Sequence, residues 1–258
     1  MRVAALYDIH GNLPALEAVL KDVHDANVDQ VVAGGDVVLG PMPRETLQCL
    51  LDLDLPVHFI HGNCELAVLA QISATESGSV NYWGTTSGKP LPESDQVVYR
   101  WTAQQLQPEY EAVIASWPKT LRLQIEGLGE VLFCHGTPRS ETEVFTRLTL
   151  EDRLLPLFEG LNVAVVICGH THMQFDRMIG RTRVVNAGSV GEPFGKPGAY
   201  WALLGPDVQL RYTPYNLMQA SEQILATSHP QAQAVAHNLL HPPSETDILE
   251  LFGKAELK

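Results

Sequence analysis

Short apolar segments of this chain each stop at residues whose side chains can bind a metal ion. Residues 2–7 and 30–34 are brief apolar runs, and residues 13–26 between them repeat their apolar side chains at helical spacing. This order is typical of a buried strand, a helix and a second, parallel strand. Later apolar runs end in the same way. The metal-binding residue types that follow these predicted strands are Asp8, His10, Asp36, Asn63, His135, His170 and His172.

The polar residues at the strand ends are expected to converge, because the carboxyl ends of parallel strands share one edge of an open α/β sheet. In extended backbone, residues two apart point to the same side of the strand. The pairs with this spacing are Asp8 with His10 and His170 with His172. Each pair is therefore expected to present its two ligands together.

The donor set predicts the kind of metal site. It contains two carboxylates, four imidazoles and one amide, and such oxygen and nitrogen ligands suit Mn²⁺, Fe²⁺, Zn²⁺, Co²⁺ or Ni²⁺. Seven protein ligands are too many for one such ion. With one carboxylate shared, they suit two ions about 3.5–4 Å apart, which activate a water molecule and clamp a phosphoryl group. Two divalent ions, with Mn²⁺ favoured, are therefore the predicted cofactors.

The order of these motifs resembles that of the calcineurin-like metallophosphoesterase family. The chain reads DIHGN, GGD, HGNCE, CHGTP and CGHTH between residues 8 and 172. From residue 186, NAGSVGEP is similar to a turn of the small prokaryotic, phosphodiesterase-like branch. Five motifs in a fixed order are a specific signal. The resemblance implies an α/β fold, a four-layer αββα sandwich of two mixed β-sheets flanked by helices.

The resemblance also implies how the ligands divide between two ions. One ion would be held by Asp8, His10, Asp36 and His172, and the other by Asp36, Asn63, His135 and His170. Asp36 would bridge the ions, and a hydroxide between them would be the nucleophile in the hydrolysis of a phosphoric ester. Asp36, Asn63 and His135 are accordingly the expected catalytic residues.

One position departs from the family motif and bears on the substrate. Where the family has a histidine after Gly-Asn, this chain has Cys64, and a neutral thiol is a weak hydrogen-bond donor. We therefore expect phosphodiesterase activity in preference to phosphomonoesterase activity. The expected substrate contacts are Cys64, Arg139 and Arg44. Cys64 takes the place of the family's histidine, and the guanidinium fork of an arginine matches phosphate oxygens. Solvated arginines, with Arg44 at the start of a helix, are the competing interpretation.

Other functions stay open on the sequence alone. A phosphoprotein or a dinucleoside polyphosphate is an alternative substrate, and a non-catalytic, metal-binding interaction module of the same fold is an alternative to an enzyme. Aromatic residues after Cys64 either stack on a nucleotide base or pack against the sandwich: Tyr82, Trp83, Tyr99 and Trp101. The histidines expected at the surface are His24, His229, His237 and His241.

The length and pattern of the chain predict one metallophosphoesterase domain over residues 1–258. Residues 65–118 loosen into Gly/Ser/Thr-rich and helical sequence, which predicts a helical cap or insertion. Further helices are expected from about residue 216 onward, interrupted at Pro230 and at Pro242-Pro243.

The charge and the cysteines narrow the expected partners and location. The formal net charge of −13 repels a phosphate backbone, so binding to bulk nucleic acid is not expected. A small phosphoester, including a nucleotide-like one, stays compatible because bound cations invert the local charge. No signal peptide or membrane span is predicted, and the four cysteines have no framework spacing. These features predict a cytoplasmic protein and leave its oligomeric state open.

Overall fold

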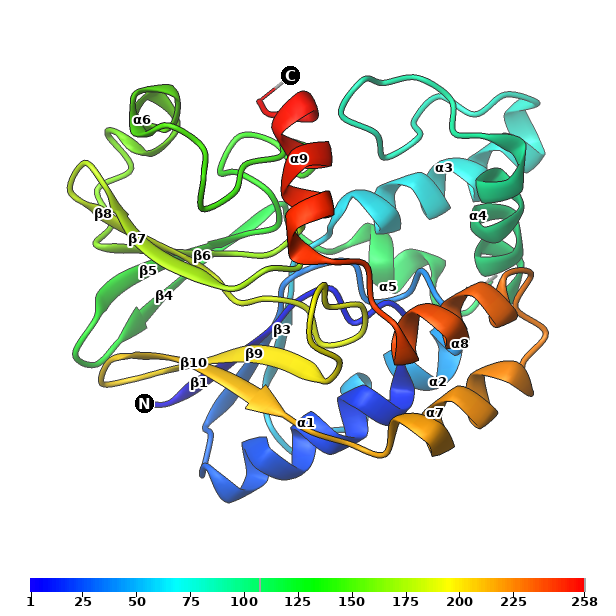
Figure 1. The fold of residues 1–258 in the computed structure, drawn as a ribbon, viewed down its shortest axis with the longest axis horizontal. Helices are drawn as coiled ribbons and strands as arrows, with labels where there is room; N and C mark the ends of the chain where they lie inside the picture. The colour runs from blue at the N-terminus through cyan, green and yellow to red at the C-terminus, as the bar shows by residue number, and fades with distance from the viewer. Residues whose placement is uncertain (107, 258) are drawn as a thin grey trace.

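The computed structural model describes residues 1–106 and 108–257, with the side chains of residues 75–77 left aside. In this described part, ten strands form two five-stranded sheets (Figure 1). The first sheet has the spatial order β10 (Val208–Thr213), β9 (Ala199–Leu204), β1 (Val3–Leu6), β2 (Gln30–Ala33) and β3 (Val57–Phe59). The second has the order β4 (Thr120–Ile125), β5 (Gly129–Cys134), β6 (Val165–Cys168), β8 (Thr182–Asn186) and β7 (Phe175–Ile179).

Both sheets are mixed, with three parallel strands extended by antiparallel ones. Strands β1, β2 and β3 are parallel, β9 runs antiparallel to β1, and β10 runs antiparallel to β9. In the second sheet β5, β6 and β8 are parallel, whereas β4 and β7 are antiparallel edges. Parallel neighbours require long crossovers. Helices α1 (Leu13–Asp25), α2 (Pro43–Leu51) and α6 (Glu151–Phe158) lie within three of these crossovers.

The sheets pack face to face, and helices cover their outer faces, which gives four layers. Val3 and Ala5 of β1 point into an apolar cluster shared by both sheets. Ala4 and Leu6 point the other way, into a cluster with α1 and α2, while α6 packs on the second sheet. Strands buried on both faces are apolar along their whole length. The predicted four-layer αββα sandwich is thereby confirmed.

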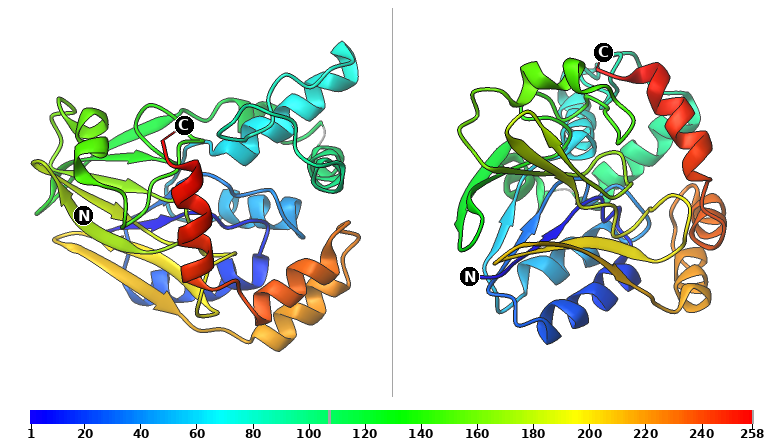
Figure 2. Two further views of the ribbon diagram at one scale, coloured as in Figure 1. Left: turned by 45° about the horizontal axis from the view of Figure 1, so that its top comes forward. Right: turned by 60° about the vertical axis from the view of Figure 1, so that its left-hand side comes forward.

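Two groups of helices follow β3 and β10; most of them stand beyond the carboxyl ends of the central strands at one end of the molecule, whereas the last helix, residues 245–255, stands nearer its middle (Figure 2, left). The first group, α3 (Asn63–Ser77), α4 (Glu93–Leu106) and α5 (Glu111–Ala115), lies in the segment expected to form a cap. The second group, α7 (Leu217–Leu225), α8 (Ala232–Leu240) and α9 (Glu245–Ala255), follows β10. Helix α7 packs on α8, and α3 packs on α4.

Three elements differ from the sequence-based expectations. Strand β7 was not expected, because it is an edge strand whose central residues Asp176, Arg177 and Met178 are exposed or half-buried. Helix α6 was not expected either, because Pro156 lies inside it. Helix α3 extends to Ser77, into sequence that looked irregular. In each case the local pattern was weak and tertiary packing decided the structure.

No helix in the described residues has both the length and the apolarity needed to cross a membrane. All four cysteines are free thiols. Cys134 and Cys168 are buried in the outer core of the second sheet, as expected for small apolar residues.

Candidate metal centre

The predicted ligands lie where the carboxyl ends of the parallel strands of both sheets meet. Asp8, Asp36 and Asn63 come after strands of the first sheet, whereas His135 and His170 come after strands of the second. The expectation that the edge of a single open sheet collects these side chains is therefore wrong. The two-sheet arrangement implied by the family resemblance is the one that the structure has.

Five of the predicted ligands adopt the left-handed backbone conformation. The φ angles are +52° at Asp8, +50° at His10, +54° at Asp36, +65° at His170 and +57° at His172. Residues with a side chain rarely adopt these angles, at a cost of roughly 1–2 kcal/mol each. The expectation of extended backbone at these positions is wrong. Because the backbone at residues 170–172 is not extended, His170 and His172 point to two different groups of ligands, which are described next.

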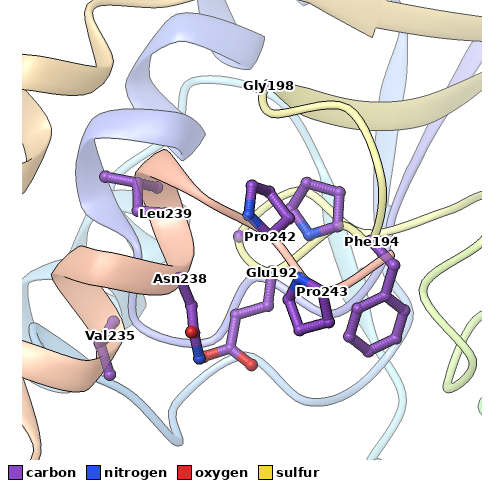
Figure 3. Close-up of a pocket in the computed structure, with 10 residues that line it drawn as sticks. Glu192, Phe194, Gly198, Val235, Asn238, Leu239, Pro242 and Pro243 are labelled. Atoms are coloured by element: carbon purple, nitrogen blue, oxygen red, sulfur yellow. The ribbon is translucent and has the colours of Figure 1, made fainter. Parts of the chain in front are cut away.

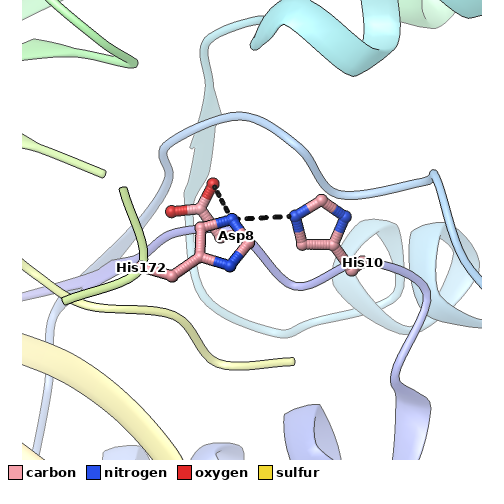
Figure 4. A group of neighbouring side chains, drawn as sticks. All are labelled: Asp8, His10 and His172. Carbon is pink, nitrogen blue, oxygen red and sulfur yellow. Dashed lines mark hydrogen bonds and ion pairs between the residues drawn. The ribbon is translucent and has the colours of Figure 1, made fainter. Parts of the chain in front are cut away.

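The side chains form two adjoining groups, within each of which the candidate ligand atoms lie no more than 4.8 Å apart. The first consists of Asp8, His10 and His172 (Figure 4), and the second of Asp36, His135 and His170. Oδ2 of Asp36 is 3.3 Å from Nε2 of His135 and 4.0 Å from Nε2 of His10. Oδ1 of Asp8 is likewise 3.4 Å from Nε2 of His172 and 3.8 Å from Nε2 of His135, so each carboxylate lies near histidines of both groups.

Three of the four histidines are oriented by the same kind of hydrogen bond. The Nδ1 atoms of His10, His135 and His172 are 3.1, 3.0 and 2.7 Å from the carbonyl oxygens of Leu39, Gly34 and Glu192, respectively. A carbonyl can only accept, so in each ring Nδ1 carries the proton and donates. Each neutral ring then presents its Nε2 lone pair to the centre, as metal-binding histidines do.

Several atoms of the centre lack a protein partner. Oδ1 of Asp8 and Nε2 of His170 are buried without a hydrogen-bond partner. Nε2 of His10 and Nε2 of His172 face each other at 3.2 Å, which is repulsive for two lone pairs unless a cation or a proton lies between them. Ligands about 2.1 Å from a divalent ion stand roughly 3.0–3.4 Å from one another. The residues present fit the divalent ions that the family implies.

The charges of the centre are strongly coupled. Burial opposes ionisation of Asp36, but the neighbouring His135 outweighs it and holds the pKa of the carboxyl well below its usual range. Burial also opposes protonation of His135, yet Asp36 and Asp8 raise the pKa of this histidine to about 10. At His172, burial is outweighed by Asp8, and the pKa rises to about 9. Burial and His135 lower the pKa of His170 to about 4.

We expect metal binding to release protons. Without metal, His135 and His172 stay protonated at pH 7, because their pKa values are about 10 and about 9. An ion needs the deprotonated Nε2, so up to about two protons should leave at pH 7 and fewer as the pH passes 9 to 10. Mn²⁺ affinity should therefore rise with pH. Calorimetric titration in buffers of different ionisation enthalpy measures this release, and a heat independent of the buffer at pH 7 would contradict it.

The fully buried Glu65 fixes the backbone of the loop that carries Asp36. Oε2 of Glu65 accepts the backbone N–H groups of Asp36 and Gly62, both at 2.8 Å. Oε1 accepts those of Val37 at 2.7 Å and Val38 at 3.3 Å. Gly62 also leaves room for Asp36, because a Cβ atom at this position would lie 2.1 Å from Oδ1. One carboxylate thus fixes the loop after β2 to the start of α3.

Asn63 and Cys64 begin α3 and take different positions. Nδ2 of Asn63 donates to the carbonyl of Gly84 at 3.1 Å, which leaves Oδ1 facing Nε2 of His135 at 3.1 Å. The N–H and the thiol of Cys64 donate to Oδ1 and Oδ2 of Asp36 at 2.9 and 3.1 Å. Burial, Asp36 and Glu65 raise the pKa of this thiol well above its usual value. The structure thus places Cys64 against the Asp36 carboxylate as a protonated donor.

The two predicted substrate arginines are paired with carboxylates. The side chain of Arg139 is 60% exposed and binds Glu143, with Nη2 of the arginine 2.5 Å from Oε1 of the glutamate. Arg44 donates to the carbonyl of Gln105 at 2.8 Å and binds Glu109 at 2.5 Å. Both guanidinium groups are therefore paired with carboxylates of the protein in this conformation.

Aromatic residues of the cap segment contact protein groups. The hydroxyl of Tyr82 donates to Glu141 at 2.7 Å, and the hydroxyl of Tyr99 lies 3.8 Å from Sγ of Cys64. Trp101 packs edge to face against His229, with ring centroids 5.1 Å apart. These contacts agree with the packing interpretation of the cap aromatics.

His229 was expected at the surface, and this expectation is wrong. The residue lies between α7 and α8, is 6% exposed, and lines the same pocket as His10. Nε2 of Gln231 donates to the carbonyl of Ser94 at 3.1 Å, which holds this turn against the start of α4. The sequence around His229 has no periodic pattern that signals such a long-range contact.

The loop between β8 and β9 covers His172, and the C-terminal helix α9 packs behind it. The ring of Phe194 stacks on the imidazole at 5.2 Å and 14°, and meets Phe252 of α9 edge to face. A small pocket of about 80 Å³ lies alongside, between residues 191–194, α8 and Pro242-Pro243 (Figure 3). Sequence reasoning did not single out Phe194, because no metal-ligand residue type marks it.

Two packed mixed sheets with paired Asp/His groups at the carboxyl ends of their parallel strands define a metallophosphoesterase-like fold. Residues 1–207 match the sequence model of the calcineurin-like phosphoesterase superfamily domain. The chain belongs to this superfamily, as its motifs indicated.

Individual relatives agree with this assignment. An uncharacterised protein of Methanocaldococcus jannaschii is 25% identical over 207 residues, which cover 74% of this chain and 76% of that protein. Among solved structures, a hypothetical protein of Pyrococcus horikoshii is similar with a TM-score of 0.76 at 20% identity, covering 92% of this chain and 97% of that one. A metallophosphoesterase from Sphaerobacter thermophilus is similar with a TM-score of 0.68 at 24% identity, covering 93% and 99%. These structures share the fold.

Proposed function

We propose that this protein is a metal-dependent phosphodiesterase that uses two divalent ions, with Mn²⁺ the first candidate. The observation that carries the proposal is the common orientation of three histidines, which present Nε2 to two buried carboxylates. One ion would be held by Asp8, His10, Asp36 and His172, and the other by Asp36, Asn63, His135 and His170. Bound ions supply Lewis-acid activation of water and neutralise charge on phosphoryl oxygens.

The protein's own groups supply a rigid arrangement of donors. The backbone carbonyls fix the histidine rings, and Glu65 fixes the loop that carries Asp36. Asp36 stays ionised because its pKa is lowered by His135 against the effect of burial. Such preorganised groups need no rearrangement while charge develops on the phosphate, which is a main source of catalytic power.

The surroundings of the centre favour a diester over a monoester. The Cys64 thiol donates to Asp36, and it offers no imidazole to protonate a basic leaving oxygen. Arg139 and Arg44 are paired with carboxylates. A phosphomonoester carries about −1.5 to −2 charge at pH 7, whereas a diester carries about −1. With these two arginines paired, neither is available to balance the extra charge of a monoester, which supports the diester.

Hydrolysis of bis-p-nitrophenyl phosphate and p-nitrophenyl phosphate, measured side by side, tests this proposal. Protein stripped of metal should be inactive, and reloading with Mn²⁺ should restore activity with kcat/KM at least about tenfold higher for the diester, or about 1.4 kcal/mol in transition-state stabilisation. A preference for the monoester would overturn the diester assignment. Two bound ions without turnover of either ester would favour the interaction module of the same fold.

A further inference from the structure

A pocket beside the proposed metal centre is lined by residues from several separate parts of the chain. His10 contributes to it from the centre, Asp95 and Tyr99 from α4, and His229 and Gln231 from the turn before α8. Its volume is about 240 Å³. A chemical group of the size of glycerol or a pentose fits into this space.

The two helical walls of the pocket are joined by one side chain. Nε2 of Gln231 donates to the carbonyl of Ser94 at 3.1 Å and lies 3.4 Å from Oδ1 of Asp95. Ser94 and Asp95 lie in the first turn of α4, and Gln231 is the N-terminal capping residue of α8. The pocket is therefore bounded by a fixed contact between the two groups of helices.

His229 is one of the residues that line this pocket, and it carries a hydrogen-bond donor without a protein partner. Its Nδ1 accepts the backbone N–H of Gln231 at 3.2 Å, so the proton of the neutral ring is on Nε2. The residue is only 6% exposed, and its Nε2 atom is buried without a hydrogen-bond partner. A buried donor without a partner is costly in a folded protein and is characteristic of a position that a ligand completes.

The charge of the pocket limits the ligand. Its lining residues, all of which lie in the described part of the chain, include Asp95 and Glu192 but neither lysine nor arginine. Two carboxylates repel a second phosphate or a carboxylate group. They can instead accept hydrogen bonds from hydroxyl groups. The lining thus distinguishes a hydroxylated group from an anionic one.

We propose that this pocket binds one ester group of the substrate, and that this group is a small hydroxylated alcohol without negative charge. This assignment rests on the proposed phosphodiesterase function, in which the phosphate lies at the metal centre next to His10. His229 donates to a hydroxyl or ester oxygen of the group, and Asp95 accepts from a hydroxyl. A dinucleoside polyphosphate is disfavoured, because its additional phosphates would face Asp95 and Glu192.

Binding of non-hydrolysable phosphonates to the Mn²⁺-loaded protein tests the pocket separately from turnover. The probes are methylphosphonate, 3,4-dihydroxybutylphosphonate and 3-phosphonopropionate, which carry no group, a hydroxylated group and an anionic group. Calorimetry should give an affinity for the dihydroxybutyl compound about tenfold higher than for methylphosphonate. The anionic compound should bind no more tightly than methylphosphonate.

Two substitutions assign the effect to named residues. His229→Phe removes the donor and keeps an aromatic ring against Trp101, so the advantage of the dihydroxybutyl compound should fall by about five- to tenfold. Asp95→Lys should tighten binding of 3-phosphonopropionate. The matched control Glu93→Lys makes the same charge change on the same turn of α4, at a side chain that is 74% exposed and does not line the pocket, and should have no such effect.

The outcomes separate the inference from the proposed function. Turnover of bis-p-nitrophenyl phosphate with equal affinities for all three phosphonates would overturn the pocket assignment alone. An unchanged advantage of the dihydroxybutyl compound in His229→Phe would do the same for the role of His229. Absence of both phosphonate binding and turnover would overturn the proposed function itself.

Discussion

Asp36→Asn should lower the metal content from about two ions per chain to less than one and reduce diester turnover by on the order of a thousandfold. Oδ1 of Asp36 accepts the N–H of Cys64 at 2.9 Å, so the new amide oxygen takes that position. The amide NH2 then replaces Oδ2, which faces His135 at 3.3 Å. An NH2 group has no lone pair to offer to a metal ion. Both ligand groups lose their shared carboxylate.

Asp8→Asn is the matched comparison, because the family resemblance assigns Asp8 to one ion and Asp36 to both. Its Oδ2 accepts the N–H of His170 at 2.9 Å, and its Oδ1 is 3.4 Å from Nε2 of His172. This change should remove about one ion and leave about one. Asp54→Asn, at an exposed position, should leave the metal content unchanged. Atomic emission after dialysis measures the ratios, and equal loss in Asp36→Asn and Asp8→Asn would contradict a bridging role.

Glu65→Gln should lower the free energy of unfolding by about 3–5 kcal/mol, a large effect for so small a change. Both carboxylate oxygens accept only backbone N–H groups, four in total. A glutamine must therefore direct its NH2 group at N–H donors, whichever way the amide is turned. The loop that carries Asp36 loses its anchor, so metal affinity should fall together with stability.

Urea unfolding of metal-free protein measures this effect without a contribution from bound ions. Glu17→Gln makes the same chemical change at an exposed position of α1 and should change the free energy of unfolding by less than about 0.5 kcal/mol. A loss below about 1 kcal/mol in Glu65→Gln would show that the four N–H groups find other acceptors, and would contradict the anchoring role.

The layers of the fold and the positions of the candidate ligands after the strands were predictable because both depend on local sequence. Strands β1 and β6 are buried on both faces, so their residues are apolar throughout and are followed at once by polar turn residues. Asp8 and His170 therefore stand out directly after them. The cap of α1 is local in the same sense, because the side chain of Asn12 accepts the N–H of Ala15 three residues on.

The features that could not be predicted from the sequence depend on contacts between distant parts of the chain. His229 becomes buried only because α8 returns to α4, and the sequence near it carries no trace of that contact. The left-handed backbone at Asp36 is maintained by Glu65, 29 residues away. Helix α6 and strand β7 were missed because Pro156 and an edge position weaken their local patterns. In these places packing, and not propensity, determines the conformation.

The contact of the C-terminal helices with the centre has a consequence for how such a protein can diversify. The part shared with the superfamily, residues 1–207, contains every predicted ligand. His229 and Gln231, which line the adjoining pocket, and Phe252, which backs Phe194, lie beyond it. On the proposed subsite, exchange of residues 217–257 between relatives should change which ester group is bound and leave the predicted ligands in place. The reaction chemistry and the choice of substrate would then reside in separate parts of the chain, and chimaeras of relatives would exchange one without the other.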